Sequence, residues 1–75
     1  MPKREDFLLF LKTVGKRIKA ERESKGISIS ELSQKTGISK KYMEKIEEGE
    51  AYGLSSTKFF KIAEALNVSP YKLVE

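Results

Sequence analysis

The chain has 75 residues, enough for one small domain, and a formal net charge of +4 at pH 7. It contains no cysteine and no histidine, which excludes disulfides, thiolate metal sites and the commonest general base. We therefore expect no metal, no cofactor and no enzymatic activity. The longest apolar run, residues 7–11, is far shorter than the roughly 20 residues of a membrane helix. This favours a soluble, cytoplasmic protein without membrane contact.

The first predicted element is a helix over about residues 5–25. Its apolar residues follow the i, i+3, i+4, i+7 spacing of one helical face and are expected in the core; they are Phe7, Phe10, Leu11, Val14 and Ile18. Gly15 interrupts this pattern at a cost of about 1 kcal/mol relative to alanine. The sequence therefore allows either one long helix or a break near Gly15.

Residues 26–49 predict two short helices, at about 29–36 and 40–48, joined by a tight turn. Ser28 and Glu31 have the spacing of a capping box, which satisfies backbone N–H groups at a helix start. Gly37 suits the left-handed conformation that ends a helix, and Ser39 can cap the next one. This layout is a helix-turn-helix, whose second helix can enter the major groove of DNA.

The remaining residues predict two more helices after a loop over residues 50–56. One spans about residues 57–66 and ends at Asn67, which tolerates the left-handed conformation. The other is short and starts at Ser69-Pro70, with serine as the cap and proline at the first helical position. No segment alternates apolar and polar residues long enough to predict a strand. We therefore expect an all-α fold, a compact bundle of five short helices around a central helix-turn-helix.

A set of motifs spread along the chain in order carries a family resemblance. The motifs are Gly15-x-x-Ile18-x-x-x-Arg22-x-x-x-Gly26, Leu32-Ser33-x-x-x-Gly37-Ile38-Ser39, Tyr42, Ile46-Glu47-x-Gly49 and Ile62-Ala63-x-Ala65-Leu66-x-Val68. Through them, residues 13–74 resemble the phage-repressor, Cro/Xre-type helix-turn-helix family of bacterial and phage transcription regulators. The resemblance implies a lambda-repressor-like DNA-binding domain over residues 13–75. Residues 1–12 are then an N-terminal extension, helical and continuous with the first helix or packed on it.

The resemblance also implies which residues contact double-stranded DNA. At the start of the second helix of the motif and one turn later, the candidates for base contacts are Lys40, Lys41, Glu44 and Lys45. The candidates for phosphate contacts are Ser28, Ser39 and Tyr42. An alternative is that these lysines pair with Glu44 and Glu48 at i,i+3 and i,i+4 spacing and form only a solvated, self-neutralised face.

A further implied contact is an ion pair between Arg22, near the end of the first helix, and Glu47, near the end of the recognition helix. Its role would be structural, since arginine can hold a carboxylate through two parallel hydrogen bonds. The chain departs from the family at Ile29, where many relatives have glutamine, and in the following loop, where Glu48 and Glu50 replace basic residues. Ile29 can offer only apolar contact, and the loop without basic residues predicts weaker and less salt-sensitive DNA binding.

Leu8 and Leu9 extend the apolar run beyond the face assigned to the core. They either cover a gap in a small core or form a dimer face. A homodimer suits the family, because two domains about 34 Å apart match two half-sites on one side of DNA.

Two functions follow from these observations. The first is a sequence-specific DNA-binding transcriptional regulator, expected to be a repressor, and the alternative is a helix-turn-helix fold used for protein–protein contact or dimerisation. The family framework and the basic pI favour the first function, whereas Ile29 and the acidic loop favour the second. Residues 1–25 hold eight Lys/Arg against four Asp/Glu, whereas residues 26–49 hold four against four. The recognition segment is thus neutral overall.

Overall fold

Four α-helices and a 3-10 turn form the described part of the chain, residues 3–75 of the computed structural model. The elements in order are α1 (Arg4–Ser24), α2 (Ile29–Thr36), α3 (Lys40–Glu47), α4 (Ser56–Leu66) and η1 (Pro70–Leu73). The expected all-α fold is confirmed. The count of five α-helices is wrong, because the segment after Ser69-Pro70 forms only four residues of 3-10 structure. The first two residues of the expected N-terminal extension, Met1 and Pro2, lie outside the described range.

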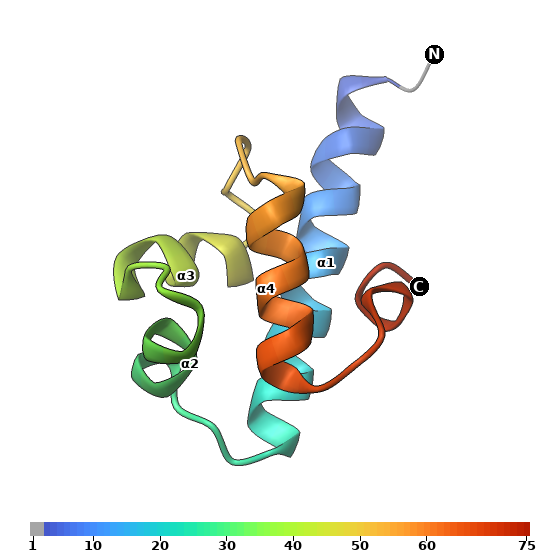
Figure 1. Ribbon diagram of the computed structural model, residues 1–75. Coiled ribbons are helices and arrows are strands. Elements are labelled where there is room, and N and C mark those ends of the chain that lie inside the picture. Colours follow the sequence, from blue (N-terminus) through green and yellow to red (C-terminus); the bar gives the residue numbers. More distant parts are fainter. Residues whose placement is uncertain (1–2) are drawn as a thin grey trace.

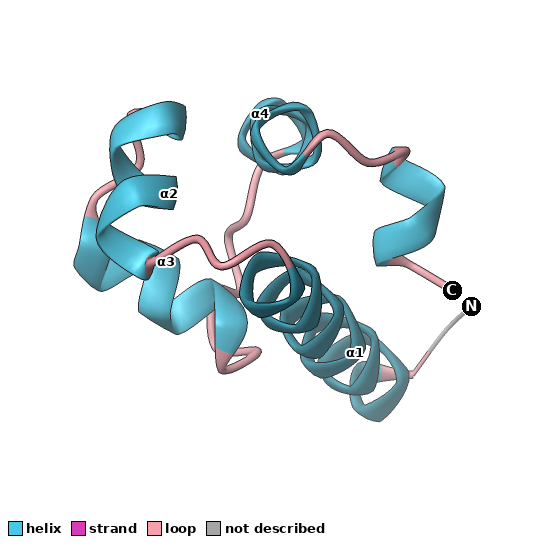
Figure 2. Cartoon of the chain, turned by 90° about the horizontal axis from the view of Figure 1, so that it is seen from below, coloured by secondary structure: helices cyan, strands magenta, loops and turns pink. Residues whose placement is uncertain are grey.

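The helices are arranged around a central pair. In Figure 1, α1 and α4 run side by side in the same general direction, with α2 and α3 on one flank and η1 on the other. The view in Figure 2, turned by 90°, shows the same arrangement with α1 and α4 seen nearly end-on. The first turns of α1 extend beyond the rest of the bundle (Figure 1). None of the described helices is long and apolar enough to cross a membrane.

Every helix contributes to one hydrophobic core. The largest side chains with almost no exposed surface are Val14, Ile18, Leu32, Met43, Ile62, Leu66 and Leu73. They come from α1, α2, α3, α4 and η1, so the short helices depend on one another for burial. Removing this apolar surface from water is the main favourable term in folding a domain of this size.

Helix α1 continues through Gly15 without a break, and the glycine has a tertiary reason. A Cβ atom at Gly15 would lie against the backbone carbonyl oxygens of Ile46 and Glu47, only 2.6 Å from the latter. Gly49, which has a φ of 76°, makes a matching approach to the backbone of Lys12. The end of α3 therefore rests directly on α1. This contact aligns the whole of the helix-turn-helix with the central pair.

Two aromatic residues expected in the core lie outside it. Phe7 and Phe10 are 46% and 48% exposed, whereas Leu11 and Val14 on the same helix are buried. The helical periodicity is as predicted. However, Phe7 and Phe10 line an open hollow between α1, the loop before α4 and the C-terminal residues, so these segments cover only part of each ring. The expectation that they are core residues is therefore wrong.

Candidate nucleic-acid interface

Local hydrogen bonds form the helix-turn-helix. The Ser28 hydroxyl accepts a hydrogen bond from the N–H of Glu31 at 3.0 Å, and the Ser39 hydroxyl accepts one from the N–H of Tyr42 at 3.1 Å. Between them, Gly37 has a φ of 76° and ends α2 in the left-handed conformation. Of the predicted Ser28–Glu31 capping box, the hydrogen bond from the Glu31 N–H to the Ser28 hydroxyl is present. The reciprocal bond from the Ser28 N–H to the Glu31 side chain is not found among the described residues. These hydrogen bonds fix the starts of α2 and α3. Backbone N–H groups at a helix start can bind a phosphate.

A bidentate ion pair connects α1 to the end of α3. The guanidinium of Arg22 donates from Nε to Glu47 Oε2 at 2.7 Å and from a terminal nitrogen to Oε1 at 3.0 Å. A third hydrogen bond, 2.9 Å long, runs to the carbonyl oxygen of Ile27 in the α1–α2 linker. The two charged side chains are only 12% and 6% exposed.

The environment of Arg22 keeps it charged. Hydrogen bonding to Glu47 raises the pKa of Arg22 above its already high ordinary value, although burial acts in the opposite direction. A bidentate arginine–carboxylate pair also fixes geometry, since both side chains have planar ends that match. Arg22 therefore connects α1, the linker before α2 and the end of α3.

On one side of α3 the structure brings four predicted contact residues together. A shallow hollow of about 200 Å³ is lined by Ser39, Lys41, Tyr42 and Lys45. Lys41 and Lys45 are exposed and lie one helical turn apart, so their ammonium groups share a face. Two cations beside a capped helix start form a surface suited to a polyanion.

The other outward side of α3 is acidic. Glu44 and Glu48 line a second, larger hollow of about 480 Å³ together with Ser28, Ile29 and residues of α1. The predicted base-contact residue Glu44 therefore lies near the start of α2, apart from Lys41 and Lys45. None of the three possible lysine–glutamate pairs along α3 comes within 4.0 Å in the part of the chain that is described. The lysines are thus available for an external anion.

One cation near α3 comes from a different helix and was not predicted. The Nζ of Lys58 lies 4.7 Å from the ring centre of Tyr42, which is a cation–π distance. Lys58 stands in the first turn of α4, where a positive charge opposes the helix dipole. Local sequence patterns make no prediction for Lys58, because this contact joins two helices that are distant in the sequence. Tyr42 itself is only partly exposed.

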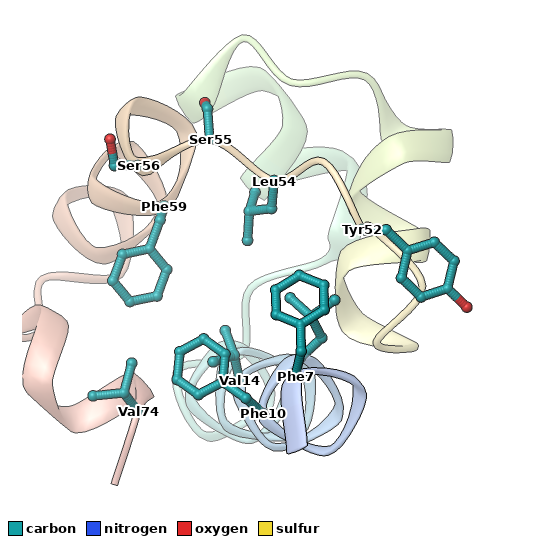
Figure 3. Close-up of a pocket in the computed structure, with 10 residues that line it drawn as sticks. Phe7, Phe10, Val14, Tyr52, Leu54, Ser55, Ser56, Phe59 and Val74 are labelled. Carbon is teal, nitrogen blue, oxygen red and sulfur yellow. The ribbon is translucent and has the colours of Figure 1, made fainter. Parts of the chain in front are cut away.

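The proposed dimer residues Leu8 and Leu9 point in different directions. Leu8 is partly buried, whereas Leu9, about 100° further round α1, is 64% exposed. Another group of exposed apolar residues lies nearby. It surrounds a hollow of about 240 Å³ between α1, the loop before α4 and the C-terminal residues, with Phe7, Phe10 and Phe59 among its walls (Figure 3).

Comparison with known proteins agrees with this geometry. Two short helices joined by a glycine turn, with the second one exposed, define a helix-turn-helix protein. A family model described as a helix-turn-helix domain matches residues 15–75. The chain belongs to this family.

The similar curated proteins are transcriptional regulators. The chain is 37% identical over 62 residues to the HTH-type transcriptional regulator SinR of Bacillus subtilis, covering 83% of this chain and 56% of that protein. It is 38% identical over 61 residues to SinR of Bacillus licheniformis, covering 81% and 55% respectively. The chain therefore spans just over half the length of these relatives.

Solved structures show the same fold. The restriction-modification controller protein C.AhdI of Aeromonas hydrophila superposes with a TM-score of 0.80 at 30% identity. The match covers 84% of this chain and 94% of C.AhdI. An HTH_3 family transcriptional regulator of Vibrio cholerae gives a TM-score of 0.82 at 30% identity, covering 89% of this chain and 37% of that one.

Proposed function

We propose that this protein is a sequence-specific DNA-binding transcriptional regulator that places α3 in the major groove of double-stranded DNA. The observation that carries the proposal is the exposed lysine side of α3, Lys41 and Lys45, beside the capped helix start at Ser39. The regulators among the similar proteins support the same function and do not favour a protein-contact module as the main role. A regulator of this kind acts in the bacterial cytoplasm, whether the bacterium or a phage encodes it.

The contacts divide between bases and phosphates. Lys40, Lys41 and Lys45 can donate to the O6 and N7 atoms of guanine, while Glu44 can only accept, so its natural base partner is the cytosine amino group. Ser28, Ser39 and Tyr42 lie at or next to the two helix starts, where backbone N–H groups meet phosphates. Lys58 joins this second set, since its ammonium group lies against Tyr42.

The acidic side of α3 limits how the domain approaches DNA. The hollow next to Ser28 has charged side chains of both signs, with Glu44 and Glu48 facing Lys19 and Arg22, whereas the charged side chains of the hollow next to Ser39 are lysines. We infer that affinity depends mainly on the Lys41–Lys45–Lys58 side. A single copy then binds weakly, and a homodimer on two half-sites about 34 Å apart supplies the required affinity. Repression is the simplest outcome, because an occupied operator needs no further contact to block transcription.

Binding across a salt series tests this function. Affinity of the 75-residue chain for mixed genomic fragments should fall as salt rises, because each neutralised phosphate contributes a slope of about −0.9 to log K against log[salt]. Lys41→Glu and Lys45→Glu should each weaken binding by about tenfold or more.

The matched control is Lys61→Glu, an exposed lysine of α4 that lines the hollow at the carboxyl end of α2. It makes the same charge change outside the hollow that Lys41 and Lys45 line, and should alter binding by less than about threefold. Equal losses in all three variants would show that only net charge matters. A flat salt response would exclude DNA as the ligand.

A further inference from the structure

The acidic side of α3 shares a hollow with the start of α2. Ile29, the first residue of α2, and Glu44, in the second turn of α3, both line this hollow of about 480 Å³. Ile29 is partly buried and packs against the core, which fixes its position, whereas Glu44 is exposed. The two helices thus present an apolar side chain and a carboxylate to the same space.

Glu44 has no partner for its negative charge among the described residues. No lysine or arginine comes within 4.0 Å of its carboxylate. Arg22, which lines the same hollow, instead donates to Glu47 and to the carbonyl oxygen of Ile27. In a groove bordered by phosphates, a carboxylate is repelled unless it accepts a hydrogen bond there. The side chain therefore favours bases that offer a donor.

Cytosine is the base that suits this carboxylate best. The donors in the major groove are the amino groups of cytosine and adenine, whereas guanine and thymine present only acceptors there. On adenine the amino group lies beside the N7 acceptor, which repels a carboxylate. On cytosine it lies beside the C5 carbon, which is not an acceptor. Glu44 therefore favours cytosine and disfavours thymine, which has the O4 acceptor where cytosine has its amino group.

Ile29 adds a preference for a methyl group next to that amino group. Its side chain has neither a donor nor an acceptor, so it can contribute only apolar contact. The apolar group that a major groove offers is the C5 methyl of thymine. A cytosine methylated at C5 carries the same group directly beside its amino group. Burying one such methyl group strengthens binding by about fourfold.

We propose that Ile29 and Glu44 together recognise a C5 methyl group beside a cytosine amino group. Either a 5-methylcytosine supplies both groups, or a cytosine supplies the amino group and a neighbouring thymine the methyl group. The inference rests on the proposed function, because it assigns a role on the same DNA to the acidic side of α3. The lysine side then supplies affinity, and the hollow at Ile29 and Glu44 selects the sequence.

Selection from a random DNA library, followed by replacement of one base type, tests this recognition. The pool selected by the 75-residue chain is copied with natural nucleotides, with 5-methylcytosine for cytosine, or with uracil for thymine. If 5-methylcytosine is the source, the methylated pool binds about fourfold more tightly. If a neighbouring thymine is the source, the uracil pool binds about fourfold more weakly, because uracil lacks the C5 methyl group. Ile29→Ser should remove either response.

Matched variants separate this contact from general effects of the modified bases. Ile27→Ser shortens another partly buried isoleucine, one that does not line the hollow, and should keep the methyl response. Glu44→Gln should lose about tenfold of the preference for cytosine over thymine, because an amide can also donate to the thymine O4 atom. Glu48→Gln makes the same change in the same hollow and should keep the preference. Glu44 is exposed, so its variant tests the proposal even if Ile29→Ser fails to fold.

Each of three results would overturn this inference alone. The first is equal affinity for all three pools while Lys41→Glu still weakens binding, which leaves the proposed function intact. The second is a methyl response that persists in Ile29→Ser. The third is an unchanged base preference in Glu44→Gln. A chain without salt-dependent binding to any pool would instead remove the proposed function and this inference together.

Discussion

The helix-turn-helix side of the molecule and the exposed side of α1 are stabilised in different ways. On the first side, directed polar contacts fix the geometry: two serine caps, a bidentate ion pair and backbone packed on backbone at Gly15. On the second, aromatic rings lie half exposed around an open hollow. Directed contacts tolerate little change, whereas a half-exposed apolar surface tolerates much. We therefore expect substitutions on the helix-turn-helix side to lower the free energy of unfolding much more than substitutions on the exposed side of α1.

The largest loss is expected at the Arg22–Glu47 pair. Arg22→Ala should lower the free energy of unfolding by about 3–5 kcal/mol, because Glu47 stays buried without its partner. Urea denaturation followed by circular dichroism measures this loss. The double variant R22M/E47L removes both charges and should recover most of the stability. If the double variant is as unstable as Arg22→Ala, packing of the side chain and not its charge explains the effect.

The next largest loss on the helix-turn-helix side is expected at Gly15. Gly15→Ala should cost about 1–3 kcal/mol despite the higher helix propensity of alanine, because its Cβ meets the carbonyl oxygens at the end of α3. The control is Gly53→Ala, where an added Cβ has no neighbour within 4 Å. Thermal unfolding should separate the two variants clearly. A stabilised Gly15→Ala would mean that α3 does not rest on α1 as closely as described.

A smaller effect is expected at the cap of α3. Ser39→Ala removes the acceptor for the N–H of Tyr42 and should cost about 1 kcal/mol. Ser39→Asp keeps an acceptor and should keep the stability, while placing a negative charge next to Lys41. Under the proposed function, Ser39→Asp binds DNA more weakly at unchanged stability. Equal stability losses in both variants would contradict a capping role.

The smallest effect is expected on the apolar side. Phe10→Ser should change the stability of the dilute monomer by less than about 1 kcal/mol, since half of the side chain is already in water. Leu11→Ala, its buried neighbour, should cost about 2–5 kcal/mol. Chemical denaturation at low protein concentration compares them. A loss at Phe10 as large as that at Leu11 would make Phe10 a core residue after all.

Features with a local cause could be predicted from the sequence. Caps at Ser28 and Ser39, and the left-handed turn at Gly37, involve residues two to five positions apart, so short-range rules describe them. The helix bounds followed from the same rules. The last segment was only partly predictable, because Ser69-Pro70 signals a helix start but gives no length. Four residues are too few for a stable α-helix.

Features with a tertiary cause could not be derived from local patterns. The role of Gly15 depends on carbonyl groups more than thirty residues away, so its sequence context indicated only a cost. The exposure of Phe10 depends on how much of its ring the loop before α4 and the C-terminal residues cover, which helical periodicity does not report. The contact of Lys58 with Tyr42 likewise joins two helices. The Arg22–Glu47 pair followed from the family resemblance, not from any spacing rule.

The attachment of α3 at its carboxyl end has a consequence for how this protein can be engineered. Gly15, Gly49 and Glu47 fix the helix at its last turn, whereas Lys41 and Lys45 project from its first two turns and contribute no buried contact. The outward residues can therefore be randomised as a library without selecting against folding. Under the proposed function, such a library would change the preferred operator sequence while the melting temperature stays close to that of the parent chain.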